Sequence, residues 1–175
     1  MGETSTHDDI PALKKGSHYH HPDLREAMIR VAEQLLESDG PGGWTVRAAA
    51  RIAGVSSGAP YRHFADKDTL LAAVAERGFN QLRGEIEARM TGAEDSASAR
   101  LAALGEAYVA FAVASPGRYQ IMFGRDIFDR KLHPSLCAAA DRTFDALRDE
   151  MQRAQSIGAL RTDQPPEAIA AAAWA

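Results

Sequence analysis

A single cysteine, Cys137, occurs among the 175 residues. One cysteine cannot build an intramolecular disulfide framework or a multi-cysteine zinc site, and such sparse usage suits a reducing cytosol. Long apolar runs are also missing, since no stretch approaches about 18 consecutive apolar residues, and the sequence predicts no transmembrane helix. The first residues lack the apolar centre of a signal peptide. We therefore expect a cytoplasmic protein with no membrane partner.

An excess of positive charge is absent as well. Twenty lysines and arginines stand against 24 aspartates and glutamates, so the formal net charge is −4 and the pI is near 5.9. The composition gives no sign of nucleic acid as a partner, and any basic surface must be local. The hydrophobic share of 45% is too high for general disorder. The length fits one compact domain or a small domain joined to a larger one.

Apolar residues recur at helical spacing along almost the whole chain, and no segment alternates convincingly as a strand does. The sequence therefore predicts an all-α fold. Glycine and proline clusters, such as SDGPGGW at 38–44, separate the predicted helices. We expect helices over about residues 24–36, 46–53, 57–64, 66–90, 101–111, 115–124 and 134–151, with one more from about 165.

The stretch GVSSGAPYRHFADKDTL, residues 54–70, follows a short alanine-rich helix. Thr45 is a suitable N-cap for that helix, and Gly54 readily takes the left-handed conformation at its end. Ser56 is expected to cap the next helix, and Asp66 the long helix after it. A helix, a tight glycine-containing turn and a second helix form the outline of a helix-turn-helix.

The charges between positions 45 and 67 are almost all positive. Arg47, Arg51, Arg62 and Lys67 stand against a single carboxylate, Asp66. An acidic side chain here would repel phosphates, so this distribution favours contact with nucleic acid.

The first residues of a recognition helix must approach base edges closely. Gly58 and Ala59 keep that end slim, and Tyr61 offers a ring for a thymine methyl and a hydroxyl for a phosphate. Lys67 lies at a helix start, where a cation opposes the macrodipole, and a bound phosphate would account for it. On spacing and charge alone, the alternative is a plain helical hairpin with Tyr61 and Phe64 in its core.

The stretch WTVRAAARIAGVSSGAPYRHFADKDTLLAAVAERGF resembles the signature of the tetracycline-repressor (TetR) family of transcriptional regulators, position by position from Thr45 to about Val74. YHHPDLREA, residues 19–27, is similar to the start of the first helix in many members. The resemblance implies a homodimer that binds a palindromic DNA operator, most often as a repressor. It also implies a helical C-terminal domain that binds a small effector and releases the DNA.

The resemblance further implies a set of DNA-contacting residues. Those expected on phosphates and the backbone are Thr45, Arg47, Tyr61, His63 and Lys67. Those expected to face bases are Ser57, Gly58 and Ala59. Arg62 stands where the family varies, so its role is open. The small core behind them would consist of Ala49, Ala50, Ala53, Val55, Phe64 and Leu70.

The C-terminal segments SPGRYQIMFG and AAAAWA resemble the WHG type of TetR C-terminal domain, with Trp174 as its tryptophan. We therefore expect a flexible polar arm at 1–20, a helix-turn-helix domain at 21–68 and a helical ligand-binding and dimerisation domain at 69–175. Members usually continue through most of this last helix and one more, and those two helices form the four-helix interface of the dimer. Either the natural protein is longer than this chain or its dimer is unusual.

Aromatic residues are rich in the C-terminal part for a helical bundle. Most belong to the core of such a bundle, yet pockets between bundle helices are lined by the same residue types. The residues expected to line an effector pocket are Tyr108, Phe111, Tyr119, Met122, Phe123, Phe144 and Trp174.

Two other functions remain open at this point. One is an interaction module without DNA binding. The other is a small helical enzyme that uses His133 or Cys137, although a nucleophile would also need a base and an orienting group. HYHH at 18–21 is a poor metal site without a nearby cysteine or carboxylate set, and no cofactor motif occurs. We expect neither catalysis, nor a metal, nor a cofactor.

Overall fold

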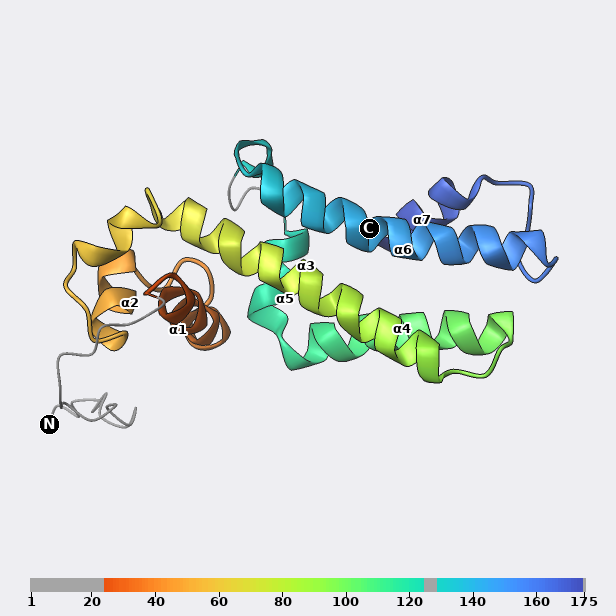
Figure 1. The fold of residues 1–175 in the computed structure, drawn as a ribbon, viewed down its shortest axis with the longest axis horizontal. Coiled ribbons are helices and arrows are strands. Elements are labelled where there is room, and N and C mark those ends of the chain that lie inside the picture. Colours follow the sequence, from red (N-terminus) through yellow and green to blue (C-terminus); the bar gives the residue numbers. More distant parts are fainter. Residues whose placement is uncertain (1–23, 125–128, 175) are drawn as a thin grey trace, which may run out of the picture.

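The computed structural model describes residues 24–124 and 129–174 (Figure 1). Within these two ranges every regular element is a helix, which confirms the all-α prediction. The α-helices are α1 (Leu24–Asp39), α2 (Val46–Ile52), α3 (Lys67–Gly92), α4 (Ala97–Ala114), α5 (Pro116–Phe123), α6 (Pro134–Ser156) and α7 (Pro166–Trp174). Two 3-10 helices are η1 (Ala59–Arg62) and η2 (Arg130–Leu132). The predicted arm at 1–20, with its histidines, lies outside the described residues.

Capping side chains fix the helix starts in the N-terminal part. The Ala48 N–H donates to Thr45 Oγ1 at 3.1 Å where α2 begins, and the Thr69 N–H donates to Asp66 Oδ1 at 2.8 Å where α3 begins. Gly54 follows α2 with a φ of +73°, a left-handed conformation that costs glycine little. The helix boundaries predicted at Thr45, Gly54 and Asp66 are confirmed.

The helix predicted over 57–64 is shorter and tighter than expected. It is the 3-10 helix η1, in which the Tyr61 N–H donates to the Gly58 carbonyl and Pro60 has no N–H to donate. No side chain caps it. Ser56 instead contributes its backbone carbonyl, which accepts from the Ala59 N–H at 3.0 Å. The prediction of an α-helix capped by Ser56 was wrong.

α3 is the longest helix and connects the N-terminal helices to the others. Figure 1 shows it leading away from the end of the molecule formed by α1 and α2, with α6 along one side and α4 and α5 along the other. It packs against α1, α4, α5 and α6. Its buried residues are Leu70, Leu71, Ala72, Val74, Ala75, Gly78, Phe79, Leu82 and Ile86.

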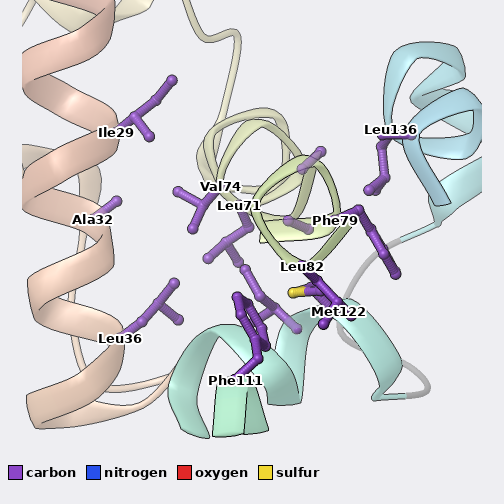
Figure 2. Packing of buried hydrophobic residues seen from close by; sticks show 14 of the residues in the cluster. Ile29, Ala32, Leu36, Leu71, Val74, Phe79, Leu82, Phe111, Met122 and Leu136 are labelled. Carbon is purple, nitrogen blue, oxygen red and sulfur yellow. The ribbon is translucent and has the colours of Figure 1, made fainter. Parts of the chain in front are cut away.

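A single apolar core continues from the N-terminal helices into the bundle. In Figure 2, Ile29 and Leu36 of α1 point toward Leu71 and Val74 of α3. The same cluster includes Phe79 and Leu82 of α3, Phe111 of α4, Met122 of α5 and Leu136 of α6. The position of the N-terminal unit is therefore set by the same packing that forms the bundle.

α4 is long and apolar enough, by length and composition alone, to cross a membrane. A mostly buried core helix of a soluble protein passes the same test, but only 22% of α4 is buried; the helix packs against α3, α5 and α6. Arg100 of α4 donates two hydrogen bonds, at 3.0 and 2.7 Å, to Glu150 of α6. Glu150 is only 3% exposed, so this ion pair joins α4 to α6 in a buried setting.

Candidate DNA interface and aromatic cluster

Most residues predicted to contact DNA are exposed at the start of α2 and in the segment around η1. They are Thr45, Arg47, Ser57, Gly58, Tyr61, Arg62 and His63. Behind them, Ala49, Ala50 and Phe64 are buried, and Ala53 and Val55 pack against the same core. Phe64 is 1% exposed and Tyr61 is 46% exposed, so the Phe64 ring packs in the core while the Tyr61 ring is open to solvent. The structure therefore offers a solvated polar and basic surface on a small apolar core.

Ala59 is not part of this exposed surface. It is the first residue of η1 and is only 8% exposed, because the tight turn directs it against the core. A base contact from its methyl group would require the turn to rearrange. The structure therefore separates Ala59 from Ser57 and Gly58, with which it was predicted to act.

Lys67 already has a partner within the protein. Its ammonium donates to the backbone carbonyl of Trp44 and lies 4.3 Å from the centroid of the Trp44 ring. Burial lowers the pKa of Lys67 from its ordinary value, while the Asp68 carboxylate opposes that shift. The cation at the start of α3 is therefore accounted for without a phosphate, although the ammonium has two further hydrogens to donate.

Arg25 is a candidate that the motif does not identify. It is exposed in the first turn of α1, and its guanidinium carbon lies 5.9 Å from the ring centroid of Phe64. This contact brings a cation from α1 next to the segment that carries Tyr61 and His63. A cation at a helix start opposes the macrodipole, and that was the available sequence signal.

Two carboxylates of α1, those of Glu26 and Glu33, lie at its junction with α3 and α5. Glu26 pairs with Arg77 of α3, and Glu33 lies 3.7 Å from Arg77 and 3.5 Å from Arg118 of α5. Burial raises the pKa of Glu33, and the two arginines partly offset this. Glu26 and Glu33 are thus paired with cations of α3 and α5.

Glu37 of α1 caps α5 from a distance of 80 residues in sequence. Its carboxylate accepts from the N–H groups of Gly117 at 2.9 Å and Arg118 at 3.2 Å. Ser115 was predicted to open this helix, yet its side chain forms no cap and accepts instead from the Arg118 guanidinium. A Cβ at Gly117 would lie 2.5 Å from the Leu36 carbonyl oxygen, so α1 and α5 approach closely only because this residue is glycine.

Five of the predicted pocket residues meet in one aromatic cluster. The ring centroids are 5.8 Å apart for Tyr108 and Tyr119, 4.7 Å for Tyr119 and Phe123, and 5.1 Å for Phe123 and Trp174. Phe144 lies 5.7 Å from Trp174. These rings come from α4, α5, α6 and α7, four helices that meet only in the folded chain.

Phe79 of α3 belongs to the same cluster, although it was not among the predicted residues. Its ring stacks on Trp174 at 5.9 Å and meets Phe123 edge-on at 5.4 Å. Its place on the apolar face of the long helix resembles that of any core residue, so the sequence carried no distinguishing signal.

Phe111 and Met122 occupy other surroundings. Phe111 is 2% exposed, with the Arg118 guanidinium carbon 5.4 Å from its ring centroid, and Figure 2 shows it in the core near α1. Met122 is fully buried against Gly78, where a Cβ would meet its sulfur. Neither has a ring contact with the aromatic cluster among the described residues, and both pack in the core instead.

The hydroxyls of Tyr108 and Tyr119 form a hydrogen bond of 2.8 Å. Burial, together with this bond, raises the pKa of Tyr108 well above its ordinary value. The Tyr108 phenol is therefore neutral at physiological pH and acts as a hydrogen-bond donor or acceptor rather than as a charge.

The described residues hold few of the features that an enzyme using Cys137 or a metal site would need. The Cys137 thiol donates to the Arg130 carbonyl at 3.3 Å, so its hydrogen bond is directed to a backbone oxygen rather than to a base. Across 24–124 and 129–174, no three histidine, cysteine, aspartate or glutamate residues are grouped to hold a metal ion. An open groove on the outer side of α4 contains Arg89, Gly105, Glu106, Val109, Ala110 and Val113.

A helix-turn-helix unit with an exposed basic surface, a long connecting helix and a helical bundle define the class: a DNA-binding transcriptional regulator. Residues 28–74 match the family described as "Bacterial regulatory proteins, tetR family", and residues 101–175 match "Tetracyclin repressor-like, C-terminal domain". The chain belongs to the TetR family, as its sequence resemblance predicted.

The chain is similar to several known proteins. It is 27% identical over 150 residues to the nucleoid occlusion factor SlmA of Marinobacter nauticus, covering 86% of this chain and 75% of that protein. It is 28% identical over 140 residues to an HTH-type transcriptional regulator of Mycobacterium tuberculosis, covering 79% of this chain and 60% of that regulator. A solved structure from Rhodococcus sp. RHA1, described as a protein with unknown function, is 35% identical with a TM-score of 0.76, covering 91% of this chain and 81% of that one.

Proposed function

We propose that this regulator is a repressor that binds a palindromic operator as a homodimer and is released by a small-molecule effector. The observation that carries the proposal is the exposed surface at α2 and η1, where Arg47, Tyr61, Arg62 and His63 stand over a buried core. This surface has the chemistry that phosphates and base edges require.

On this proposal, Thr45 and Arg47 bind phosphates at the start of α2, and Tyr61 and His63 contact the backbone next to the bases. Ser57 and Gly58 are exposed and slim enough to approach base edges. Arg25 and Lys67, at the starts of α1 and α3, add cations to the same end of the molecule. We retain Ala59 as a packing residue of η1 rather than a base contact, because it is buried.

The operator is an inverted repeat if two copies bind together. The two recognition elements must then lie about one DNA turn apart to enter successive major grooves. We propose domain limits near residue 68 for the DNA-binding part, with residues 69–175 contributing to effector binding and dimerisation. This limit falls in the first turn of α3, which belongs to both parts.

α5 is the element we propose for coupling effector and DNA. Its first turn is capped by Glu37 of α1, and its later residues Tyr119 and Phe123 belong to the aromatic cluster. An effector that binds the cluster better in one position of α5 shifts the population of that position, and with it α1. The shift can be no larger than the difference between the effector's affinities for the two states.

The remaining parts of the proposal follow from this role. A regulator that reads operator DNA works in the cytoplasm of a bacterium, and it requires neither a catalytic residue nor a cofactor. The enzyme reading of Cys137 and His133 is the less favoured one, because the thiol is bonded to a carbonyl.

The test is selection of binding sites from a random duplex library with the purified protein, read by sequencing. Enrichment of an inverted repeat supports the dimeric operator-binding protein. Enrichment of a lone half-site supports DNA reading by a chain that does not dimerise. No enrichment, from protein with a helical circular dichroism spectrum and a cooperative melt, would overturn the proposal in favour of an interaction module.

A further inference from the structure

The aromatic cluster has polar groups at both ends of a row of rings. The row passes from Tyr119 to Phe123 at 4.7 Å, from Phe123 to Phe79 at 5.4 Å, and from Phe79 to the guanidinium carbon of Arg130 at 5.9 Å. Trp174 contacts the rings of Phe79 and Phe123. Tyr119, Phe123 and Trp174 are only partly buried, so solvent reaches the cluster at these rings, whereas Phe79 is fully buried.

Arg130 is a half-buried cation with few acceptors among the described residues. Across residues 24–124 and 129–174, no carboxylate forms an ion pair with Arg130, and its one hydrogen bond is a long one of 3.4 Å to the Ile121 carbonyl. Burial lowers the pKa of Arg130, as expected for a guanidinium held against an aromatic ring. A half-buried arginine that has no carboxylate partner among the described residues retains donors that suit an anionic oxygen.

The tyrosine pair at the other end also has a hydrogen to donate. Two hydroxyls bring two hydrogens, and the 2.8 Å bond between Tyr108 and Tyr119 uses one of them. The other has no acceptor among the described residues. A ligand oxygen would supply one.

We propose that the effector is a small organic anion with an apolar body, whose anionic group binds Arg130 and whose body packs on the partly exposed rings of Phe123 and Trp174. A second oxygen on its body would accept from the Tyr108–Tyr119 pair. This inference rests on the proposed function, since it names the chemical class of the effector. The surface of α4 at Val109 and Val113, which is apolar and exposed, lies outside this site.

Two dyes that share one skeleton test the charge requirement. 8-Anilinonaphthalene-1-sulfonate carries an anion, and N-phenyl-1-naphthylamine is its neutral counterpart; both gain fluorescence in apolar surroundings. The wild-type protein is expected to bind the sulfonate about tenfold or more tightly than the neutral amine, because only the sulfonate forms a partly desolvated charge pair with Arg130. This comparison needs no variant.

Variants then locate the site. Arg130→Gln is expected to remove most of the preference for the sulfonate while leaving binding of the neutral amine within about twofold. Arg130→Lys is expected to keep part of the preference. Arg161→Gln, which removes an exposed arginine beyond α6, and Val113→Asp, which changes the apolar surface of α4, are the matched controls and are expected to change neither dye.

Three results would overturn the inference. They are equal binding of the two dyes by the wild-type protein, a preference that survives in Arg130→Gln, and a preference abolished by Val113→Asp. If Arg130 serves only to hold η2 against α5, Arg130→Gln lowers thermal stability and changes both dyes alike. Operator binding, measured without dye, is a separate readout. Dye discrimination without operator binding would refute the proposed function alone, and operator binding without dye discrimination would refute this inference alone.

Discussion

Arg47 is exposed in the first turn of α2, two residues after the Thr45 cap. A phosphate contact there contributes affinity without reading sequence. The role of such a residue is best measured through salt dependence, because each neutralised phosphate releases condensed counterions.

Arg47→Ala is expected to weaken operator binding by about 1.5 kcal/mol, the size of a charge-assisted hydrogen bond. It is also expected to reduce the slope of log K against log salt by about 0.9. Fluorescence anisotropy with the selected operator at several salt concentrations measures both. Arg89→Ala, which removes an arginine near the far end of α3, is the control and should leave the slope unchanged. An unchanged slope for Arg47→Ala would exclude a phosphate contact.

Glu33 is a titratable residue at the junction between α1, α3 and α5. Its pKa is raised from 4.5 mainly by burial, so the folded state binds its proton more tightly than the unfolded state does. The stability that protonated Glu33 contributes is present below pH 4.5 and is lost as the pH rises through the raised value.

The free energy of unfolding of the wild type, minus that of Glu33→Gln, is therefore expected to fall as the pH rises above 4.5. Glutamine keeps the shape of the protonated acid and removes the ionisation. Urea unfolding of both proteins between pH 4 and pH 8 measures the difference. A difference that rises with pH would show that Arg77 and Arg118 outweigh burial at this site.

At the scale of elements, α5 is the link between the N-terminal unit and the aromatic cluster. It is eight residues long, and its first N–H groups are satisfied by Glu37 of α1 rather than by its own N-cap. Gly117 lets the two backbones meet. The same short helix carries Tyr119 and Phe123, so a small displacement of α5 changes both contacts.

Gly117→Ala is expected to destabilise the protein, by about 1–3 kcal/mol, because its Cβ would lie 2.5 Å from the Leu36 carbonyl oxygen and a backbone must shift. Gly84→Ala in α3 is the matched control. A Cβ there meets nothing within 4 Å, and the change is expected to stabilise the helix by about 0.5–1 kcal/mol. Thermal and urea unfolding measure both; a stabilised Gly117→Ala protein would contradict the close approach.

At the scale of the molecule, the apolar cluster joins residues from Met28 of α1 to Ala170 of α7. α3 belongs to both parts, and Figure 1 shows it as one continuous helix that leads from the N-terminal unit into the bundle. A core of this kind unfolds as a unit in small proteins.

We therefore expect one cooperative transition in calorimetry, with the calorimetric enthalpy equal to the van't Hoff enthalpy. The fluorescence of Trp44, in the N-terminal part, and of Trp174, in α7, should change at the same temperature. Two resolved transitions would show that the N-terminal unit folds independently of the bundle. Residues 24–64 alone, at about 40 residues, are expected not to fold, since so small a unit buries too little surface.

Much of this molecule could be predicted from the sequence because many of its determinants are local. The caps at Thr45 and Asp66 each involve an N–H three residues away, and helical spacing identified most buried positions of α1 and α3. The same locality explains the error at η1. Pro60 and an uncapped Gly58 tightened the turn, although the expected cap at Ser56 suited a longer helix.

The sequence by itself determined the helical class, the positions of the turns, the family and the exposed basic surface, since these depend on residues close together in the chain. Only the tertiary structure decided that Glu37 caps α5, that Trp44 holds Lys67, and that Arg130 lies against Phe79. These contacts join residues 80, 23 and 51 positions apart. Helix packing brings them together, and packing depends on the fit of whole surfaces, which no local pattern of residues specifies.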